Sequence, residues 1–200
     1  PNIMKALIFD LETGSTDYLK YSVLSVGALA GNVDTGEILD SFEALVKLAA
    51  KEDYIITPKA MSINKLSIED CLQNGLTKEE ISQKFTDLYL KNGCHLLGGH
   101  NVDFDIRFVS HQIFGISISE FESNFTYRKI DTMPLIRMFA GVENMKAGAS
   151  LKDTCKALNI RVDDTSKFHS ALFDAIASFR IMCKFRKAFQ DPEFIKKVSS

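Results

Sequence analysis

The stretch Ile8-Phe9-Asp10-Leu11-Glu12-Thr13-Gly14 places two carboxylates one residue apart at the end of an apolar run. Residues 6–9 are continuously apolar, which predicts a strand that is buried on both faces. Because side chains alternate along a strand, Asp10 and Glu12 should project to one face and Leu11 to the other. Two like charges this close repel unless a cation lies between them, so a divalent metal site is one interpretation. Solvated acids in a loop after the strand are the alternative.

The composition predicts one domain that spans residues 1–200, since 46% of the residues are hydrophobic and one core can be built from them. Pro1 to Ile3 precede Met4 and are interpreted as a processed or leftover end. The chain has no apolar run of about 18 residues and no signal-peptide pattern, so we expect a cytoplasmic protein. The net charge of −2 excludes a protein that binds nucleic acid mainly by global charge. The four cysteines have no CxxC spacing and are expected to be buried thiols.

Hydrophobic patterning predicts a mixed sheet flanked by helices, because strands come first and then alternate with helices. Strands are expected at residues 22–30 and 37–46, with turn residues between them, so the first three strands should form an antiparallel meander. Later strands are expected at 94–99 and 126–130. Helices are expected in five further places: a short one from Pro58, one after the capping box of Thr77 and Glu80, one through Phe104 and Ile113, one from Asp131 through Phe139, and one from Ser150 to Leu158. A last helix should run from about Ser170 to Ala188.

Two later stretches carry further acidic residues next to helix starts. Gly98 to Asp105 lies between a short strand and a helix, which puts Asp105 in the first helical turn. Helix capping or a favourable interaction with the helix dipole would also explain an acid there. In Phe168 to Ala175, His169 precedes Asp174 by five positions at the start of an apolar helix. If His169 lies in the entering loop, it can reach over the helix face that carries Asp174.

Taken together, these residues resemble the DEDD-type 3′-to-5′ exonucleases of the histidine-containing branch (DEDDh), the group of the polymerase III epsilon-like proofreading domains. The three motifs are Phe9-Asp10-Leu11-Glu12-Thr13-Gly14, His100 to Asp105, and His169 to Ala175. The resemblance covers nearly the whole chain. It implies an α/β, ribonuclease H-like fold with a five-stranded mixed sheet, whose first three strands are antiparallel, flanked by helices.

The resemblance also implies a metal centre with two divalent ions, Mg²⁺ or Mn²⁺. Asp10 would bridge both ions, Glu12 and Asp174 would complete one site, and Asp105 would hold the second. Carboxylate oxygens are the hard ligands that these ions prefer. His169 would deprotonate the attacking water, a role for which an unperturbed imidazole pKa of about 6.5 is suitable.

Substrate contacts are expected around the first two motifs. Similar family loops suggest that Thr13 and Gly14 offer backbone donors to a terminal ribose 3′-OH. Asn101 is expected to order the second motif or to touch substrate. Three apolar side chains are candidates for stacking or wedging the last base, with core packing as the alternative: Leu11, Met61 and Phe104.

The predicted activity is hydrolysis of phosphodiester bonds at free 3′ ends of single-stranded DNA by a two-metal mechanism, which releases nucleoside 5′-monophosphates. The same chemistry on RNA, of the oligoribonuclease or tRNA-trimming type, is an alternative because no residue clearly reads the 2′-OH. A proofreading subunit that binds a polymerase, or a repair protein with another partner, is a further alternative, although no obvious binding tail follows Gln190. A phosphatase of the haloacid dehalogenase group, with Asp10 as nucleophile, would need Asp rather than Glu at position 12.

Overall fold

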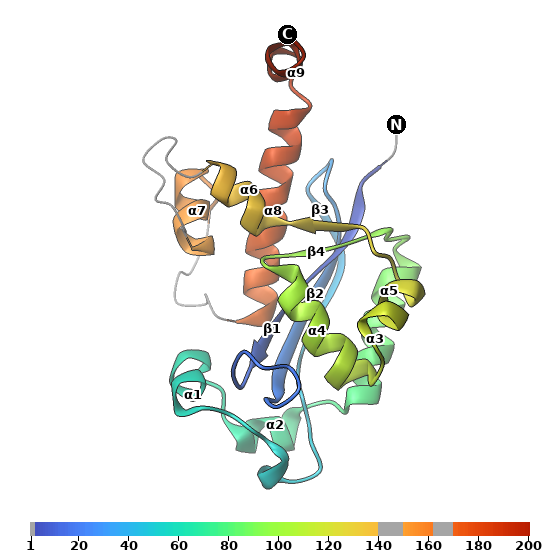
Figure 1. Cartoon of the computed structure of the whole chain (residues 1–200), viewed down its shortest axis with the longest axis vertical. Coiled ribbons are helices and arrows are strands. Elements are labelled where there is room, and N and C mark those ends of the chain that lie inside the picture. Colours follow the sequence, from blue (N-terminus) through green and yellow to red (C-terminus); the bar gives the residue numbers. More distant parts are fainter. Residues whose placement is uncertain (1–2, 140–149, 162–169) are drawn as a thin grey trace.

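The computed structural model describes residues 3–139, 150–161 and 170–200 (Figure 1). Within them, five strands form one sheet in the order β3-β2-β1-β4-β5. The strands β1 to β3 pair antiparallel, whereas β4 and β5 join in parallel. The predicted ribonuclease H-like mixed sheet is therefore confirmed. The strand bounds are Lys5–Thr13 (β1), Val23–Asn32 (β2), Glu37–Leu45 (β3), Leu96–Gly99 (β4) and Lys129–Asp131 (β5).

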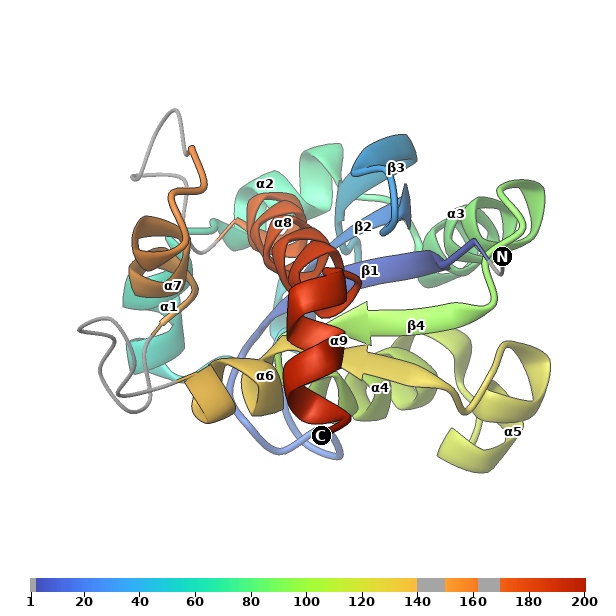
Figure 2. The same cartoon turned by 90° about the horizontal axis from the view of Figure 1, so that it is seen from above.

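Helices cover both faces of the sheet (Figure 2). The long helix α8, Ala171–Phe189, packs on one face, and α3, Lys78–Lys91, packs on the other together with α4, Val102–Phe108, and α5, Ile118–Asn124. A π-helical segment, Val109–Phe114, directly continues α4. The predicted capping box of α3 is present, because the side chain of Thr77 accepts from the Glu80 N–H and Glu80 bonds back to the Thr77 N–H.

The shorter helices include three that the sequence patterns did not predict. Their bounds are Ile68–Asn74 (α2), Ile118–Asn124 (α5) and Pro192–Val198 (α9). Each has about two turns and follows a side-chain N-cap, which was not identified from the sequence: Ser67, Ser117 or Asp191. The remaining helices were predicted and are confirmed: Pro58–Asn64 (α1), Thr132–Phe139 (α6) and Leu151–Ala157 (α7). A short 3₁₀ turn spans Lys51–Asp53.

The two faces of β1 have different surroundings. Leu7, Phe9 and Leu11 belong to the larger hydrophobic core, which is built with α3 and α4. Ala6 and Ile8 belong to a second cluster on the opposite face, which is formed with α8. This alternation places Asp10 and Glu12 on the α8 face, as the period of two predicts.

Close contact between β2 and α8 depends on Gly27. A Cβ atom at this position would lie 2.1 Å from the backbone nitrogen of Leu172. Only a glycine therefore lets the first turn of α8 approach the sheet this closely. The same turn carries Asp174, so this packing brings α8 to the acidic end of β1.

Two predictions about the whole chain can be compared with the structure. Among the described residues, no helix is both long and apolar enough to cross a membrane. The thiols of Cys71, Cys94 and Cys155 are buried and free, and Cys183 is half-buried and free. The expectation of buried thiols rather than disulfides is confirmed for the first three.

Candidate active site

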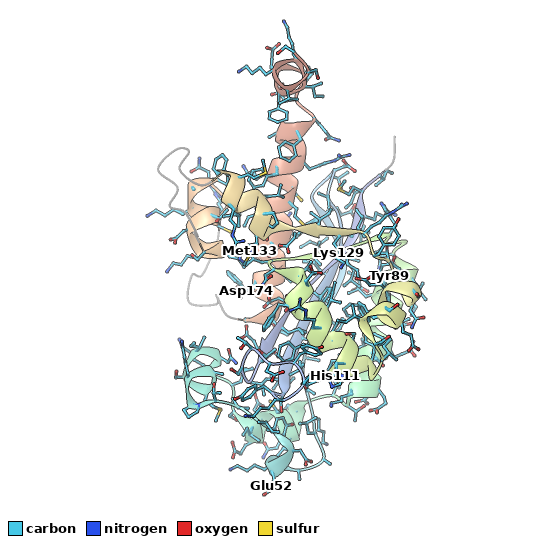
Figure 3. The ribbon with its side chains drawn as sticks, in the orientation of Figure 1. Glu52, Tyr89, His111, Lys129, Met133 and Asp174 are labelled. Atoms are coloured by element: carbon cyan, nitrogen blue, oxygen red, sulfur yellow. The ribbon has the colours of Figure 1, made fainter. Side chains whose placement is uncertain are left out.

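Three carboxylates converge where the end of β1 meets the start of α8. Asp10, Glu12 and Asp174 each offer one oxygen, and these oxygens all lie within 4.8 Å of one another. Glu12 is only 8% exposed and Asp174 only 9%. Figure 3 shows Asp174 near the start of α8, beside the sheet. A single cation could contact all three side chains at this spacing.

The electrostatics of the cluster favour a bound cation. Burial, followed by the charges of Asp174 and Glu43, raises the pKa of Glu12 from 4.5 to about 8. Burial and the neighbouring carboxylates of Asp105, Asp174 and Glu12 raise the pKa of Asp10 well above its usual range. Ionised carboxylates are costly in such a place unless an opposite charge balances them. The cluster therefore fits a metal ion, and its all-oxygen donors are of the hard kind that Mg²⁺ and Mn²⁺ prefer.

Asp105 approaches the cluster from the opposite side of β1. It lies in the first turn of α4, is 2% exposed, and is the neighbouring charge with the largest effect on the pKa of Asp10. Burial also raises the pKa of Asp105, while a hydrogen bond from the Leu11 backbone opposes the rise. Its oxygens are not among the three that converge within 4.8 Å. Asp105 is thus electrostatically coupled to Asp10 although it lies outside the group of three converging oxygens.

Asp131 accounts for the capping at the start of α4. Its carboxylate accepts hydrogen bonds from the backbone N–H of Asn101 at 2.8 Å and of Val102 at 3.0 Å. The same side chain accepts from the Met133 N–H at 2.9 Å, at the start of α6, as predicted for an N-cap. A residue of β5 therefore supplies acceptors for the first N–H groups at the start of α4.

Glu43 anchors the start of α8 from β3. One oxygen of Glu43 accepts from the Ser170 hydroxyl at 2.9 Å and from the Leu172 N–H at 2.7 Å. Ser170 itself makes no side-chain cap to α8, so Glu43 supplies the missing acceptor. The sequence patterns did not identify Glu43, because it lies 127 positions from Ser170 and has no local capping pattern. This contact holds the turn that carries Asp174.

A cavity of about 540 Å³ begins beside the acid cluster and extends along β3 toward α3. Its polar lining comes from seven side chains: Glu12, Ser25, Glu43, Asn64, Asn74, Lys84 and Ser170. The volume is in the range of small-ligand sites. The carboxylate cluster is therefore adjacent to a cavity of the size of a nucleotide.

The sequence pattern of the exonuclease family (RNase_T) matches residues 7–182 of this chain. The chain belongs to this exonuclease family. The DNA polymerase III subunit epsilon of Buchnera aphidicola subsp. Baizongia pistaciae (strain Bp) is 26% identical over 179 residues, which cover 86% of this chain and 66% of the relative. The chain thus spans slightly less than two thirds of that relative. The predicted membership of the DEDD-type exonucleases is confirmed.

Solved structures show the same fold. A zinc-bound complex of E. coli exonuclease I with single-stranded DNA superposes with a TM-score of 0.74 at 17% identity, covering 98% of this chain and 43% of that one. Pop2p of S. pombe, bound to Mg²⁺ and Mn²⁺, superposes with a TM-score of 0.69 at 12% identity, covering 94% of this chain and 87% of that one. At these identities the likeness supports the ribonuclease H-like fold alone.

His169, the predicted general base of this exonuclease family member, lies outside the described residues. Its neighbour Ser170 is described and is held by Glu43. The role of His169, and with it the assignment to the histidine-containing branch, stays a prediction.

Gly14 and Leu11, two of the predicted substrate contacts, make other contacts within the described part of the chain. The Gly14 N–H donates to the Ser22 carbonyl at 2.8 Å, and the Gly14 carbonyl accepts from the Thr57 N–H at 2.9 Å. The Gly14 amide is therefore not free to donate to a ribose hydroxyl, and this residue instead ties the end of β1 to the chain before α1. Leu11 is 6% exposed and packs in the larger core. Leu11 thus contributes to core packing, and its contact with the last base stays a prediction.

The substrate contacts of Thr13 and Met61 stay predictions. Thr13 is half-buried, and its carbonyl accepts from the Asn64 side chain at 3.0 Å, which holds α1 beside the end of β1. Met61, on this helix, is 40% exposed. Their predicted roles are untested by these contacts.

Asn101 and Phe104 occupy the start of α4. Asn101 is exposed, has a left-handed backbone with φ of 58°, and donates its N–H to Asp131. This supports the prediction that Asn101 orders the second motif. Phe104 is half-buried, with its ring centroid 5.0 Å from that of Phe108. Part of its surface thus serves core packing, and base stacking stays a prediction.

Proposed function

We propose that this protein is a metal-dependent 3′-to-5′ exonuclease that acts on single-stranded DNA and releases nucleoside 5′-monophosphates. The observation that carries the proposal is the convergence of Asp10, Glu12 and Asp174 within 4.8 Å in a chain of the exonuclease family. The raised pKa values of Asp10 and Glu12 add support. They mean that the ionised carboxylates are unfavourable here unless a nearby cation balances their charge.

The four acids would hold two divalent ions, Mg²⁺ or Mn²⁺. Asp10, Glu12 and Asp174 would hold one ion, and Asp10 with Asp105 would hold the other. When bound, such ions lower the pKa of water and stabilise charge on the phosphate and on the leaving oxygen. The residues of the chain contribute fixed ligand positions, since β1 and α4 are buried on both sides of the site.

His169 would act as the general base of the reaction. The neutral imidazole takes a proton from water, whose oxygen forms a bond to phosphorus as the bond to the 3′-oxygen of the preceding nucleotide breaks. The leaving oxygen takes up a proton, so the released nucleotide carries a 5′-phosphate and the shortened strand has a new 3′-OH. Glu43 supports this arrangement by holding Ser170, the next residue along the chain.

DNA is the proposed substrate, with a polymerase or repair protein as the proposed partner. The curated relative is a DNA polymerase III subunit, and the exonuclease I structure is a complex with single-stranded DNA. RNA remains the alternative to be tested in the same assay.

The test uses DNA and RNA strands of the same sequence that carry a 5′ label, with Mg²⁺ or Mn²⁺ and with EDTA as the control. We expect metal-dependent shortening of the DNA from its 3′ end, and protection of a strand whose 3′-OH is blocked. Faster shortening of the RNA would change the substrate assignment. If a metal-replete protein leaves both strands intact, the proposed function is wrong.

A further inference from the structure

A second cavity, of about 390 Å³, lies between the residues that follow α7 and the C-terminal half of α8. Four cationic side chains line it, and we call it the basic groove: Arg161, Arg180, Lys184 and Lys187. The remaining lining residues are Asn159, Ile160 and Cys183, so no acidic side chain of the described residues contributes. The basic groove does not overlap with the cavity beside the acid cluster.

The spacing of the cations gives the basic groove an elongated shape. Arg180, Lys184 and Lys187 recur at i, i+4 and i+7, so they follow one exposed stripe of α8. Arg161 faces this stripe from the segment after α7. A row of separated positive charges matches a ligand with several negative charges in a row better than it matches a single anion.

These cations are not neutralised within the described part of the chain. Lys51, Lys129 and Arg186 each form an ion pair with an acid, but none of the four groove cations does so with another described residue. Like charges that line one cavity without counter-charges repel one another, and a bound anion would relieve the repulsion. In a chain with a net charge of −2, this local excess of positive charge is a distinct feature.

Arg180 is also held in place before any ligand binds. One terminal nitrogen donates to the Gly36 carbonyl at 2.7 Å, and the guanidinium lies 5.5 Å from the centre of the Phe179 ring. A guanidinium has five N–H donors, so this bond leaves others for a phosphate. Because the side chain is fixed in advance, less conformational entropy is lost on binding.

We propose that the basic groove binds the phosphate backbone of the single-stranded substrate, several nucleotides away from the scissile bond. This inference rests on the proposed function. Lys184 follows Asp174 by ten positions, which is about 15 Å along the helix axis. At a spacing of about 3.4 Å per nucleotide, a strand with its 3′ end in the acid cluster reaches the groove after about four or five nucleotides. Longer strands gain the contact, and shorter ones do not.

The test compares two double variants with the same change in charge. Lys184→Glu with Lys187→Glu changes the basic groove, and Lys196→Glu with Lys197→Glu changes exposed lysines of α9 outside it. Binding is measured by fluorescence anisotropy in an Asp10→Asn background, with DNA of about 3 and about 20 nucleotides over a range of salt concentrations. We expect the groove variant to bind the long strand about tenfold more weakly, with the salt slope reduced by about 0.7 per lost phosphate contact. The α9 variant should bind like the unchanged background.

Cleavage by the same double variants, with Asp10 intact, separates this inference from the proposed function. We expect the groove variant to cleave the short strand at the rate of the unchanged protein and to cleave the long strand with a raised KM. Equal binding of the long strand by the groove and α9 variants would overturn the inference, and so would an equal loss for short and long strands. If the unchanged protein cleaves neither strand, the proposed function fails, while the binding comparison still decides whether the groove holds nucleic acid.

Discussion

The two faces of β1 show how one strand serves stability and chemistry at once. On one face, Phe9 packs into an aromatic core in which its ring centroid lies 5.1 Å from that of Phe85. On the other face, one position along the chain, Asp10 meets Asp174 in a cluster of buried carboxylates. The first face contributes apolar burial to folding, whereas the second carries charge that burial makes costly. The comparison indicates that apolar burial on one face of β1 offsets the free-energy cost of burying carboxylates on the other.

Removing a carboxylate should have the largest effect, and it should act on activity alone. We expect Asp10→Asn or Asp174→Asn to slow cleavage by at least about 10³-fold, equivalent to about 4 kcal/mol in the activation barrier. The melting temperature without metal should stay the same or rise, since repulsion within the cluster decreases. Asp103→Asn, an exposed acid near Asp105, is the matched control and should keep its activity. An Asp10→Asn or Asp174→Asn variant with normal turnover would show that the site is elsewhere.

Truncating the aromatic core should act on stability alone. Phe85 is fully buried and contacts the rings of Phe9, Phe114, Phe121 and Phe125. We expect Phe85→Ala to lower the free energy of unfolding by about 3–5 kcal/mol, as measured with urea. Phe194→Ala, on the exposed helix α9, is the control and should cost much less. If Phe85→Ala protein is folded but has a much lower kcat, the aromatic face of β1 also contributes to activity, and the separation of roles between the two faces is wrong.

The stability of the metal-free protein should decrease as the pH rises. The pKa of Glu12 is about 8 in the folded protein and has its ordinary value of 4.5 in the unfolded chain. Between these values the folded protein binds more protons, so the free energy of unfolding falls with pH. At about 1.4 kcal/mol per pKa unit, we expect a loss of a few kcal/mol between about pH 5 and pH 9. This loss is measured by urea unfolding in the presence of EDTA at several pH values.

Two controls sharpen the pH experiment. Glu12→Gln should reduce the loss of stability with pH, because the amide does not ionise, while Asp10 and Asp105 still contribute to it. Saturating Mg²⁺ or Mn²⁺ should also reduce this loss, because the cation stabilises the ionised carboxylates. A metal-free stability that rises over this pH range would contradict the assignment of the cluster as a site of uncompensated charge.

Loss of the Glu43 anchor should have a smaller effect on both properties. Glu43→Ala leaves the Leu172 N–H without its acceptor, and loss of a helix cap typically costs about 1–2 kcal/mol. We also expect weaker activation by Mn²⁺, because the turn that carries Asp174 is less well held. Glu37→Ala, an exposed acid on the same strand, is the control. Glu43→Gln keeps an acceptor, so its loss of stability and of activation by Mn²⁺ should lie between those of Glu43→Ala and Glu37→Ala. If Glu43→Ala and Glu37→Ala match in both measurements, the anchor has no role.

Local patterns predicted a large part of this molecule. The apolar run at residues 6–9 identified β1, and the alternation beyond it assigned Asp10 and Glu12 to one face. The capping box at Thr77 identified the start of α3. The two-turn helices α2, α5 and α9 were missed because their N-caps, Ser67, Ser117 and Asp191, are not followed by a recognised apolar stripe. The hydrogen bond from the Gly14 amide to Ser22 could not be predicted, because Ser22 belongs to another segment.

The sequence by itself determined the strands and the longer helices, because alternation and capping act over a few neighbouring residues. The ordered motifs, by their resemblance to the exonuclease family, indicated the acids. Only the tertiary structure decided how close the acids lie, which carboxylate holds α8 and which cations line the basic groove. These contacts join distant positions, such as Glu43 and Leu172, which are 129 residues apart. They arise when β1, β3 and α8 pack together around the core, and Gly27 allows the close approach that packing requires.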